Sequence, residues 1–122
     1  GSDELNRIQQ DVERRVQEAQ TTATRDVWQR LFDKVEKIAE RLSDPTSKFR
    51  DSLIENAREM CELLPRLNFT DDPQLEAMRQ EVESKLVSMS VEVLRSDPLV
   101  RRNTAADAKA IMDKMSVFMG AV

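Results

Sequence analysis

The sequence predicts an all-α protein, a four-helix bundle-like domain whose first helix is longer than the other three. Three observations lead to this fold class. Only two glycines and four prolines interrupt 122 residues, of which 34% are charged and 39% hydrophobic, a balance typical of helices with charged outer faces. Apolar residues recur every three or four positions along most of the chain, as expected for amphipathic helices. Three Asp-Pro pairs, a common helix-starting signal, divide the chain.

The first predicted helix covers residues 4–43, which contain neither glycine nor proline. Its apolar series is Leu5, Ile8, Val12, Val16, Ala19, Ala23, Val27, Leu31, Val35, Ile38 and Leu42. The mean spacing of about 3.7 residues is closer to an eleven-residue repeat than to a heptad. From Val27 onward the apolar face widens with Trp28, Phe32 and Ala39. We therefore expect residues 1–26 to project as a coiled-coil-like half-helix and residues 27–122 to form the helical bundle domain.

The projecting half of this helix is the first candidate interaction surface. Forty helical residues span about 60 Å, whereas the other predicted helices, of about 19–23 residues, span only about 30–35 Å. The apolar strip left in water consists of Leu5, Ile8, Val12 and Val16. We expect a second helix to cover this strip, most simply the same segment of another copy in a homo-oligomer, parallel or antiparallel. Two alternatives stay open: an upstream region of a longer chain covers the strip, or a break at Thr21–Thr24 lets the leading half fold back.

The Asp-Pro pairs predict the starts of the remaining helices. Proline suits the first helical position because its missing N–H needs no partner there, and a preceding aspartate can cap the free N–H groups. The candidate structural pairs are Asp44 with Pro45, Asp72 with Pro73, and Asp97 with Pro98. They predict helices over 45–64, 73–95 and 98–119. Pro65 is expected to stop the first of these, leaving a loop over residues 65–72.

Asn56 is a further candidate structural residue. It lies four residues after Ser52 and is expected on the inward side of its helix, beside Leu53 and Met60. Polar groups near a core need hydrogen-bond partners, so we expect Asn56 to hold the backbone of the 65–72 loop. A recognition role for Asn56 is the alternative.

Three methionines lie on one face of the last predicted helix: Met112, Met115 and Met119. Flexible methionine side chains can line an adaptable groove for a partner, which makes this face the second candidate interaction surface. The preferred interpretation is that the same face is simply core.

The residue inventory argues against an enzyme. There is no histidine, the single cysteine Cys61 cannot build a cysteine-rich zinc site, and the only glycines, Gly1 and Gly120, form no phosphate-binding loop. The neighbouring carboxylates of Asp71 and Asp72 are explained by helix capping. Cys61 lies on an apolar stripe and is expected to be an inert core residue. We therefore expect no catalytic residues, cofactor or metal.

Charge and hydropathy limit the partners and the compartment. The net charge is −4 and the isoelectric point about 5.0, and the nearest basic cluster, Arg95, Arg101 and Arg102, is diluted by Asp97. Nucleic-acid binding is therefore not expected. The mean hydropathy is −0.58 and no long uncharged apolar run occurs, so no membrane-spanning segment is expected. A single cysteine fits a reducing compartment, and we expect a cytoplasmic location.

Residues 27–119 resemble the C-terminal part of a family of uncharacterised phage and prophage proteins, a domain of unknown function. The most specific pieces are "FRDSLIEN" and "LPRLNFTDDP", followed by "LRSDPLVRR" and "AKAIMDKMSVFM". The resemblance implies a bacterial host cell and a position beside MoxR-like AAA+ ATPases and von Willebrand-type proteins, but no catalytic residues. Gly1-Ser2 is typical of an expression-tag remnant, so we expect Asp3 to lie inside a longer natural chain.

Two functions follow as expectations. The first is a noncatalytic helical protein–protein interaction module of a phage or prophage protein that associates with itself. The alternative, which depends on the resemblance, is a regulatory or adaptor subunit acting with a MoxR-like AAA+ ATPase and a von Willebrand-type partner.

Overall fold

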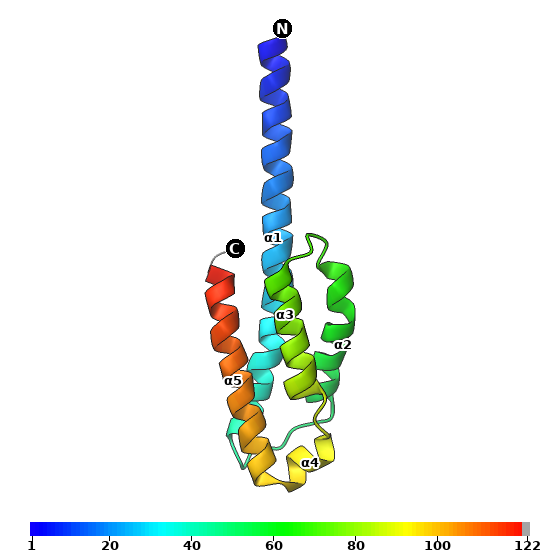
Figure 1. Ribbon diagram of the computed structural model, residues 1–122, viewed down its shortest axis with the longest axis vertical. Helices are drawn as coiled ribbons and strands as arrows, with labels where there is room; N and C mark the ends of the chain where they lie inside the picture. The colour runs from blue at the N-terminus through cyan, green and yellow to red at the C-terminus, as the bar shows by residue number, and fades with distance from the viewer. Residues whose placement is uncertain (121–122) are drawn as a thin grey trace.

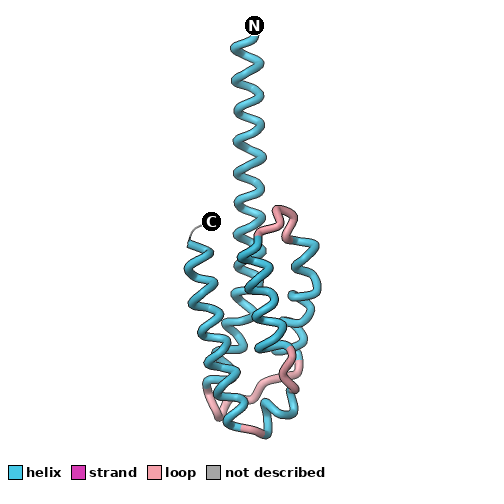
Figure 2. The backbone as a smooth tube through the Cα atoms, in the orientation of Figure 1, coloured by secondary structure: helices cyan, strands magenta, loops and turns pink. Residues whose placement is uncertain are grey.

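The computed structural model describes residues 1–120. The elements in chain order are α1 (Ser2–Ser43), α2 (Ser52–Leu67), α3 (Pro73–Val82), a π-helical turn η1 (Glu83–Val87), α4 (Val91–Ser96) and α5 (Pro98–Gly120). Successive long elements run in opposite directions, and the short α4 crosses the end of the bundle (Figure 1). The described residues contain no strand (Figure 2). The predicted all-α, bundle-like fold with an overlong first helix is therefore confirmed.

The hydrophobic core lies between the second half of α1 and the elements α2, α3 and α5 that pack around it. α1 contacts α5 most extensively, then α2, and α3 least. Its buried side chains are Val27, Trp28, Leu31, Val35, Ile38, Ala39 and Leu42. These residues continue the apolar series predicted from the sequence, widened by Trp28 and Ala39, so the period of the pattern identified the buried face of α1 correctly.

The structure corrects the prediction of one helix over residues 73–95. α3 passes into the π-helical turn, in which the N–H of Ser88 donates to the carbonyl of Glu83 at 3.0 Å. Ser90 then begins α4, and its Oγ accepts a hydrogen bond from the N–H of Val93 at 3.5 Å. Serine hydroxyls compete with the helical ladder for backbone groups. The serines between the two apolar stretches therefore end one helix and begin the next.

Two of the three predicted Asp-Pro helix starts are confirmed. Oδ1 of Asp72 accepts hydrogen bonds from the backbone N–H groups two and three residues later, at 3.0 and 3.3 Å, and Pro73 is the first residue of α3. Asp97 does the same for α5, at 3.0 and 3.2 Å, with Pro98 as the first helical residue. Each carboxylate thus satisfies two donors that have no partner inside the helix.

The third pair, Asp44-Pro45, does not begin a helix, and this prediction was wrong. Oδ1 of Asp44 accepts hydrogen bonds from the backbone N–H and the hydroxyl of Thr46, at 2.9 and 2.7 Å. These bonds close a turn, and the hydroxyl bond is the main reason that the pKa of Asp44 lies below its usual value. Residues 44–51 form a loop before α2. Arg101 binds carbonyl groups of this loop, a distant constraint that the dipeptide itself does not reveal.

Pro65 does not stop α2, contrary to the prediction. It lies inside the helix, two residues before the helix ends. Because proline removes only its own N–H, a single hydrogen bond is lost close to the helix end. The N–H of Asn68 donates to the carbonyl of Leu64 at 2.8 Å and closes the last turn. The loop is therefore shorter than predicted and covers residues 68–72.

Candidate interaction surface

The first half of α1 extends beyond the bundle with no other element beside it (Figure 1). No residue of α1 before Val27 is buried, so about 35 Å of helix projects. The apolar strip on this segment is exposed as predicted: Leu5 67%, Ile8 61%, Val12 53% and Val16 51%. The strip does not make α1 a membrane helix, because no helix in residues 1–120 is both long and apolar enough to cross a membrane.

The alternative in which α1 breaks at Thr21–Thr24 and its leading half folds back is wrong, because α1 is continuous from end to end. The bundle holds the helix just after this point. Trp28 is buried, its Nε1–H donates to Oδ2 of Asp72 at 3.3 Å, and its ring lies 5.9 Å from that of Phe118. The helix-propensity cost of threonine is below about 0.7 kcal/mol per residue. That cost is too small to break a helix that is held firmly on one side.

The polar residues beside the strip differ between its two edges. Glu4 and Arg15 lie along one edge, eleven residues or about three turns apart, and Gln9 and Gln20 lie along the other with the same spacing. Arg15 pairs with Asp11 of its own helix at 3.0 Å, an exposed ion pair of little energetic weight. One edge is therefore charged with both signs, and the other is neutral.

The methionine face of α5 belongs to the core. Met115 is fully buried, and Met112 and Met119 are half-buried against the core cluster. This face is therefore part of the core, which agrees with the preferred interpretation. Met115 offers no surface to a partner. Of the two candidate interaction surfaces, only the apolar strip of α1 is open to solvent.

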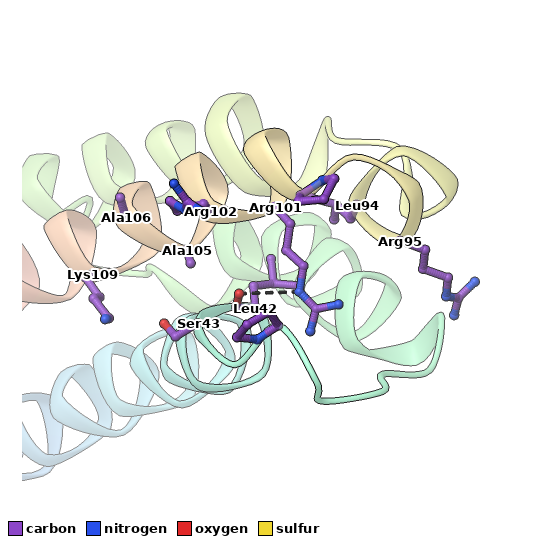
Figure 3. Close-up of a pocket in the computed structure, with 11 residues that line it drawn as sticks. Leu42, Ser43, Leu94, Arg95, Arg101, Arg102, Ala105, Ala106 and Lys109 are labelled. Carbon is purple, nitrogen blue, oxygen red and sulfur yellow. Dashed lines mark hydrogen bonds between the residues drawn. The ribbon is translucent and has the colours of Figure 1, made fainter.

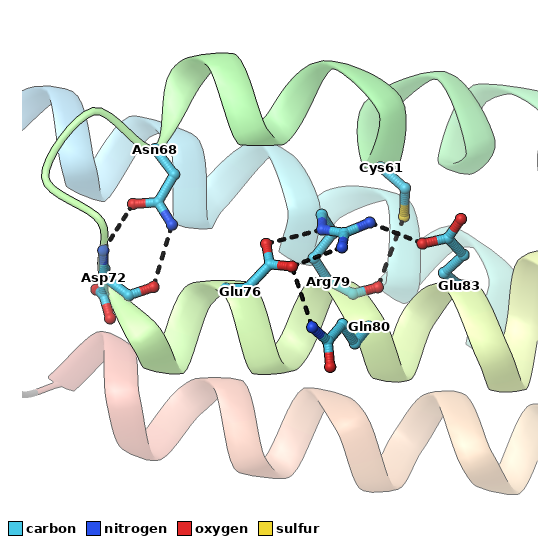
Figure 4. Close-up of polar contacts among 7 residues, drawn as sticks. All are labelled: Cys61, Asn68, Asp72, Glu76, Arg79, Gln80 and Glu83. Atoms are coloured by element: carbon cyan, nitrogen blue, oxygen red, sulfur yellow. Dashed lines mark hydrogen bonds and ion pairs between the residues drawn. The ribbon is translucent and has the colours of Figure 1, made fainter.

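The residue that holds the 68–72 loop is Asn68, and the prediction for Asn56 was wrong. Asn56 is exposed on α2, at a distance from the loop. The Nδ2 group of Asn68 donates to the carbonyl of Asp72 at 3.1 Å, and its Oδ1 accepts from the N–H of Asp72 at 2.9 Å (Figure 4). The intervening Asp71 has a φ of 52°, a left-handed conformation that aspartate tolerates. Asn68 thus fixes the backbone from which Asp72 caps α3.

We expect Asn68→Ala to lower the free energy of unfolding by about 1–3 kcal/mol, because it leaves the N–H of Asp72 without a protein partner and removes one of the two hydrogen bonds to the Asp72 carbonyl. Asn56→Ala is the matched control and should change stability by less than about 0.5 kcal/mol. Urea unfolding followed by circular dichroism measures both. Equal midpoints for the two variants would show that Asn68 does not hold the loop.

A second polar cluster joins α3 to the π-helical turn. Arg79 donates to Glu76 at 2.5 and 2.8 Å and to Glu83 at 2.7 Å (Figure 4). The hydrogen bond from Arg79 is the main reason that the pKa of Glu76 lies below its usual value. Each ion pair joins residues three or four positions apart, so the cluster braces the helix surface and forms no site open to a ligand.

Cys61 of α2 lies beside this cluster, with its thiol 3.9 Å from the carbonyl of Arg79 (Figure 4), and it is buried, as expected for a core cysteine. Burial, helped by the nearby charge of Glu83, raises the pKa of its thiol to about 11. The thiolate is the nucleophilic form of cysteine, so Cys61 remains protonated and unreactive in the folded protein at neutral pH.

A cavity of about 330 Å³ lies where the end of α1 meets α4 and the start of α5 (Figure 3). Four cations line it, Arg95, Arg101, Arg102 and Lys109. Figure 3 shows Arg95 directed away from the cavity, where it pairs with Asp51 at 2.6 Å. The four cations therefore do not converge on one point, as a bound anion would require.

Arg101 uses its guanidinium to hold the 44–51 loop. Its Nη2 group donates to the carbonyls of Arg41, Asp44 and Ser47 at 2.9, 2.7 and 2.6 Å. The guanidinium also lies 5.2 Å from the centre of the Phe49 ring. The sequence placed Arg101 in a basic cluster but carried no signal for this role, which joins groups more than fifty residues apart.

Comparisons with protein-family models, with curated protein sequences and with solved structures find no significant match to this chain. The resemblance to phage and prophage proteins therefore stays a prediction, as do the AAA+ ATPase and the von Willebrand-type protein that it implies as partners.

Proposed function

We propose that this protein is a noncatalytic helical protein–protein interaction module that associates with itself through the apolar strip of α1. The observation that carries this proposal is the exposure of four large aliphatic side chains on one face of a projecting helix. The bundle buries its core without help from this segment, since every buried residue of α1 lies at or after Val27. The projecting segment is therefore available for a purpose other than folding.

The energetic terms favour association that depends on concentration. Full burial of one valine, leucine or isoleucine side chain is worth about 1.5–3 kcal/mol, and each residue of the strip is already partly covered by its own helix. Two copies contribute eight such side chains. Their combined burial is of the same order as the cost of association, about 4–15 kcal/mol. We therefore expect an equilibrium between monomer and dimer.

Ile8→Gln should weaken self-association more than tenfold, because each dimer loses two buried aliphatic side chains. Leu99→Gln is the matched control, since Leu99 and Ile8 are both 61% exposed and Leu99 lies outside the strip. Sedimentation velocity across a dilution series measures the dissociation constants. A wild-type protein that stays monomeric at every concentration, or two variants that dissociate equally, would contradict the proposal.

A further inference from the structure

We infer that the two copies pair their projecting helices in an antiparallel arrangement, with the two-fold axis near residue 10, so that the bundles stand at opposite ends of one rod. The inference rests on the proposed self-association and adds the identity, orientation and register of the partner. The occupant of the apolar strip is a second copy of this chain. The charges along the edges of the strip favour the antiparallel orientation.

The apolar residues match in this register. With the axis near residue 10, Leu5 of one copy lies opposite Val16 of the other, and Ile8 lies opposite Val12. The two-fold axis repeats both contacts. All eight exposed aliphatic side chains are then paired, and none of the strip is left in water. A two-stranded seam of this kind is the usual way in which an isolated amphipathic helix covers its apolar face.

The charged edge complements itself in the same register. In an antiparallel pair, each edge of the seam faces the same edge of the partner helix. Glu4 of one copy then lies opposite Arg15 of the other, and the symmetry axis supplies the reciprocal pair. The local partner of Arg15, Asp11, is shared with Arg14, which pairs with it at 2.5 Å. Arg15 can therefore turn toward the second copy while the Asp11 carboxylate stays neutralised.

The other arrangements lack this complementarity. In a parallel pair, each edge faces the opposite edge of the partner, so Glu4 lies opposite Gln9, and Arg15 lies opposite Gln20. No ion pair forms. An antiparallel pair whose axis is shifted toward residue 15 brings the two copies of Arg15 together, which is repulsive. Charge thus selects both the antiparallel orientation and the register near residue 10.

This arrangement gives the dimer two ends with the same surface. The bundles begin about 25 Å from the axis on either side, and the rod between them is continuous helix. The protein would then act as a rigid spacer that presents two identical bundles in opposite directions.

Charge reversal tests the pairing. Glu4→Lys and Arg15→Glu each place like charges opposite each other twice per dimer, and each should raise the dissociation constant about tenfold at low salt. A mixture of the two variants should form heterodimers as tightly as the wild type, because both contacts are again of opposite sign. Arg14→Glu is the matched control, since it also breaks a bond to Asp11 but lies on the outer face. It should leave dimerisation unchanged.

Spin labels measure the orientation directly. Arg30→Cys places a label on an exposed position of the bundle, while the buried thiol of Cys61 stays unlabelled. The antiparallel pair predicts a distance of about 60 Å between the two labels, whereas a parallel pair brings them within about 30 Å. A dimer with the short distance, with a charge-insensitive affinity, or with heterodimers no tighter than the single variants overturns the orientation but leaves self-association standing. A trimer overturns the two-stranded pair, and a monomer at all concentrations overturns both proposals.

Discussion

Met115→Asp is expected to unfold the protein under conditions in which the wild type is folded. Met115 is fully buried on α5, the helix that contacts α1 most extensively. An aspartate at this position would place a carboxylate in the core without a partner, or bind a proton at a cost. We expect a loss of about 4–5 kcal/mol or more, which is comparable to the whole stability of a domain of this size. Circular dichroism should show the loss of cooperative thermal unfolding.

Val117→Asp provides the control for this prediction. Val117 lies two residues later on the same helix and is 73% exposed, so the new carboxylate stays in water. The change should cost less than about 1 kcal/mol, mostly through the unfavourable charge near the helix C-terminus. A Met115→Asp variant that melts like Val117→Asp would mean that the methionine face is not core. It would restore the interpretation of this face as a partner groove.

Arg101→Ala should have the second-largest effect, a decrease of about 2–3 kcal/mol in the free energy of unfolding. The substitution removes a charged donor from carbonyls at the end of α1 and in the loop at once, and a hydrogen bond to a charged group contributes about 1.5–3 kcal/mol to stability. Arg101 is only partly buried, so water recovers part of the loss. The stacking of its guanidinium on Phe49 is lost as well.

Two variants separate the geometry of Arg101 from its charge. Arg101→Lys keeps the charge but lacks the planar group that reaches several carbonyls, so it should recover less than half of the lost stability. Arg102→Ala removes an exposed neighbouring cation and should change stability by less than about 0.5 kcal/mol. Urea unfolding measures all three proteins. If Arg102→Ala were as unstable as Arg101→Ala, the stability would depend on the total positive charge around the cavity and not on the hydrogen bonds from Arg101 to the carbonyls.

The two asparagines show where prediction of the structural residues failed. Asn56 lies inside the helix predicted over residues 45–64 and Asn68 inside the loop predicted over residues 65–72, and the sequence pattern favours Asn56 because of its apolar neighbours. Asn68 lies four residues before Asp72 in the chain, and the structure brings its side chain close enough to bond both the N–H and the carbonyl of Asp72. The spacing of Asn68 and Asp72 across a short loop was a usable signal. The predicted helix end at Pro65 lengthens the loop and hides this signal.

The sequence by itself determined the all-α class, the apolar face of α1, two helix starts and the excess length of the first helix. Each of these depends on contacts within one or two helical turns, or on the length of one helix against the others. Asp72 and Asp97 cap their helices because the N–H groups that they bind lie only two and three residues away. Such short-range interactions are the same in nearly every fold.

Only the tertiary structure decided the features that depend on distant groups. Asp44-Pro45 has the same two residues as the other pairs, yet it forms a turn in a loop whose carbonyls Arg101 binds from α5. The strip of α1 and the methionine face of α5 have similar apolar patterns, but one is exposed and the other buried. Periodicity shows which side of a helix is apolar. Whether another element covers that side depends on how the whole chain packs, because burial is a property of the assembled core.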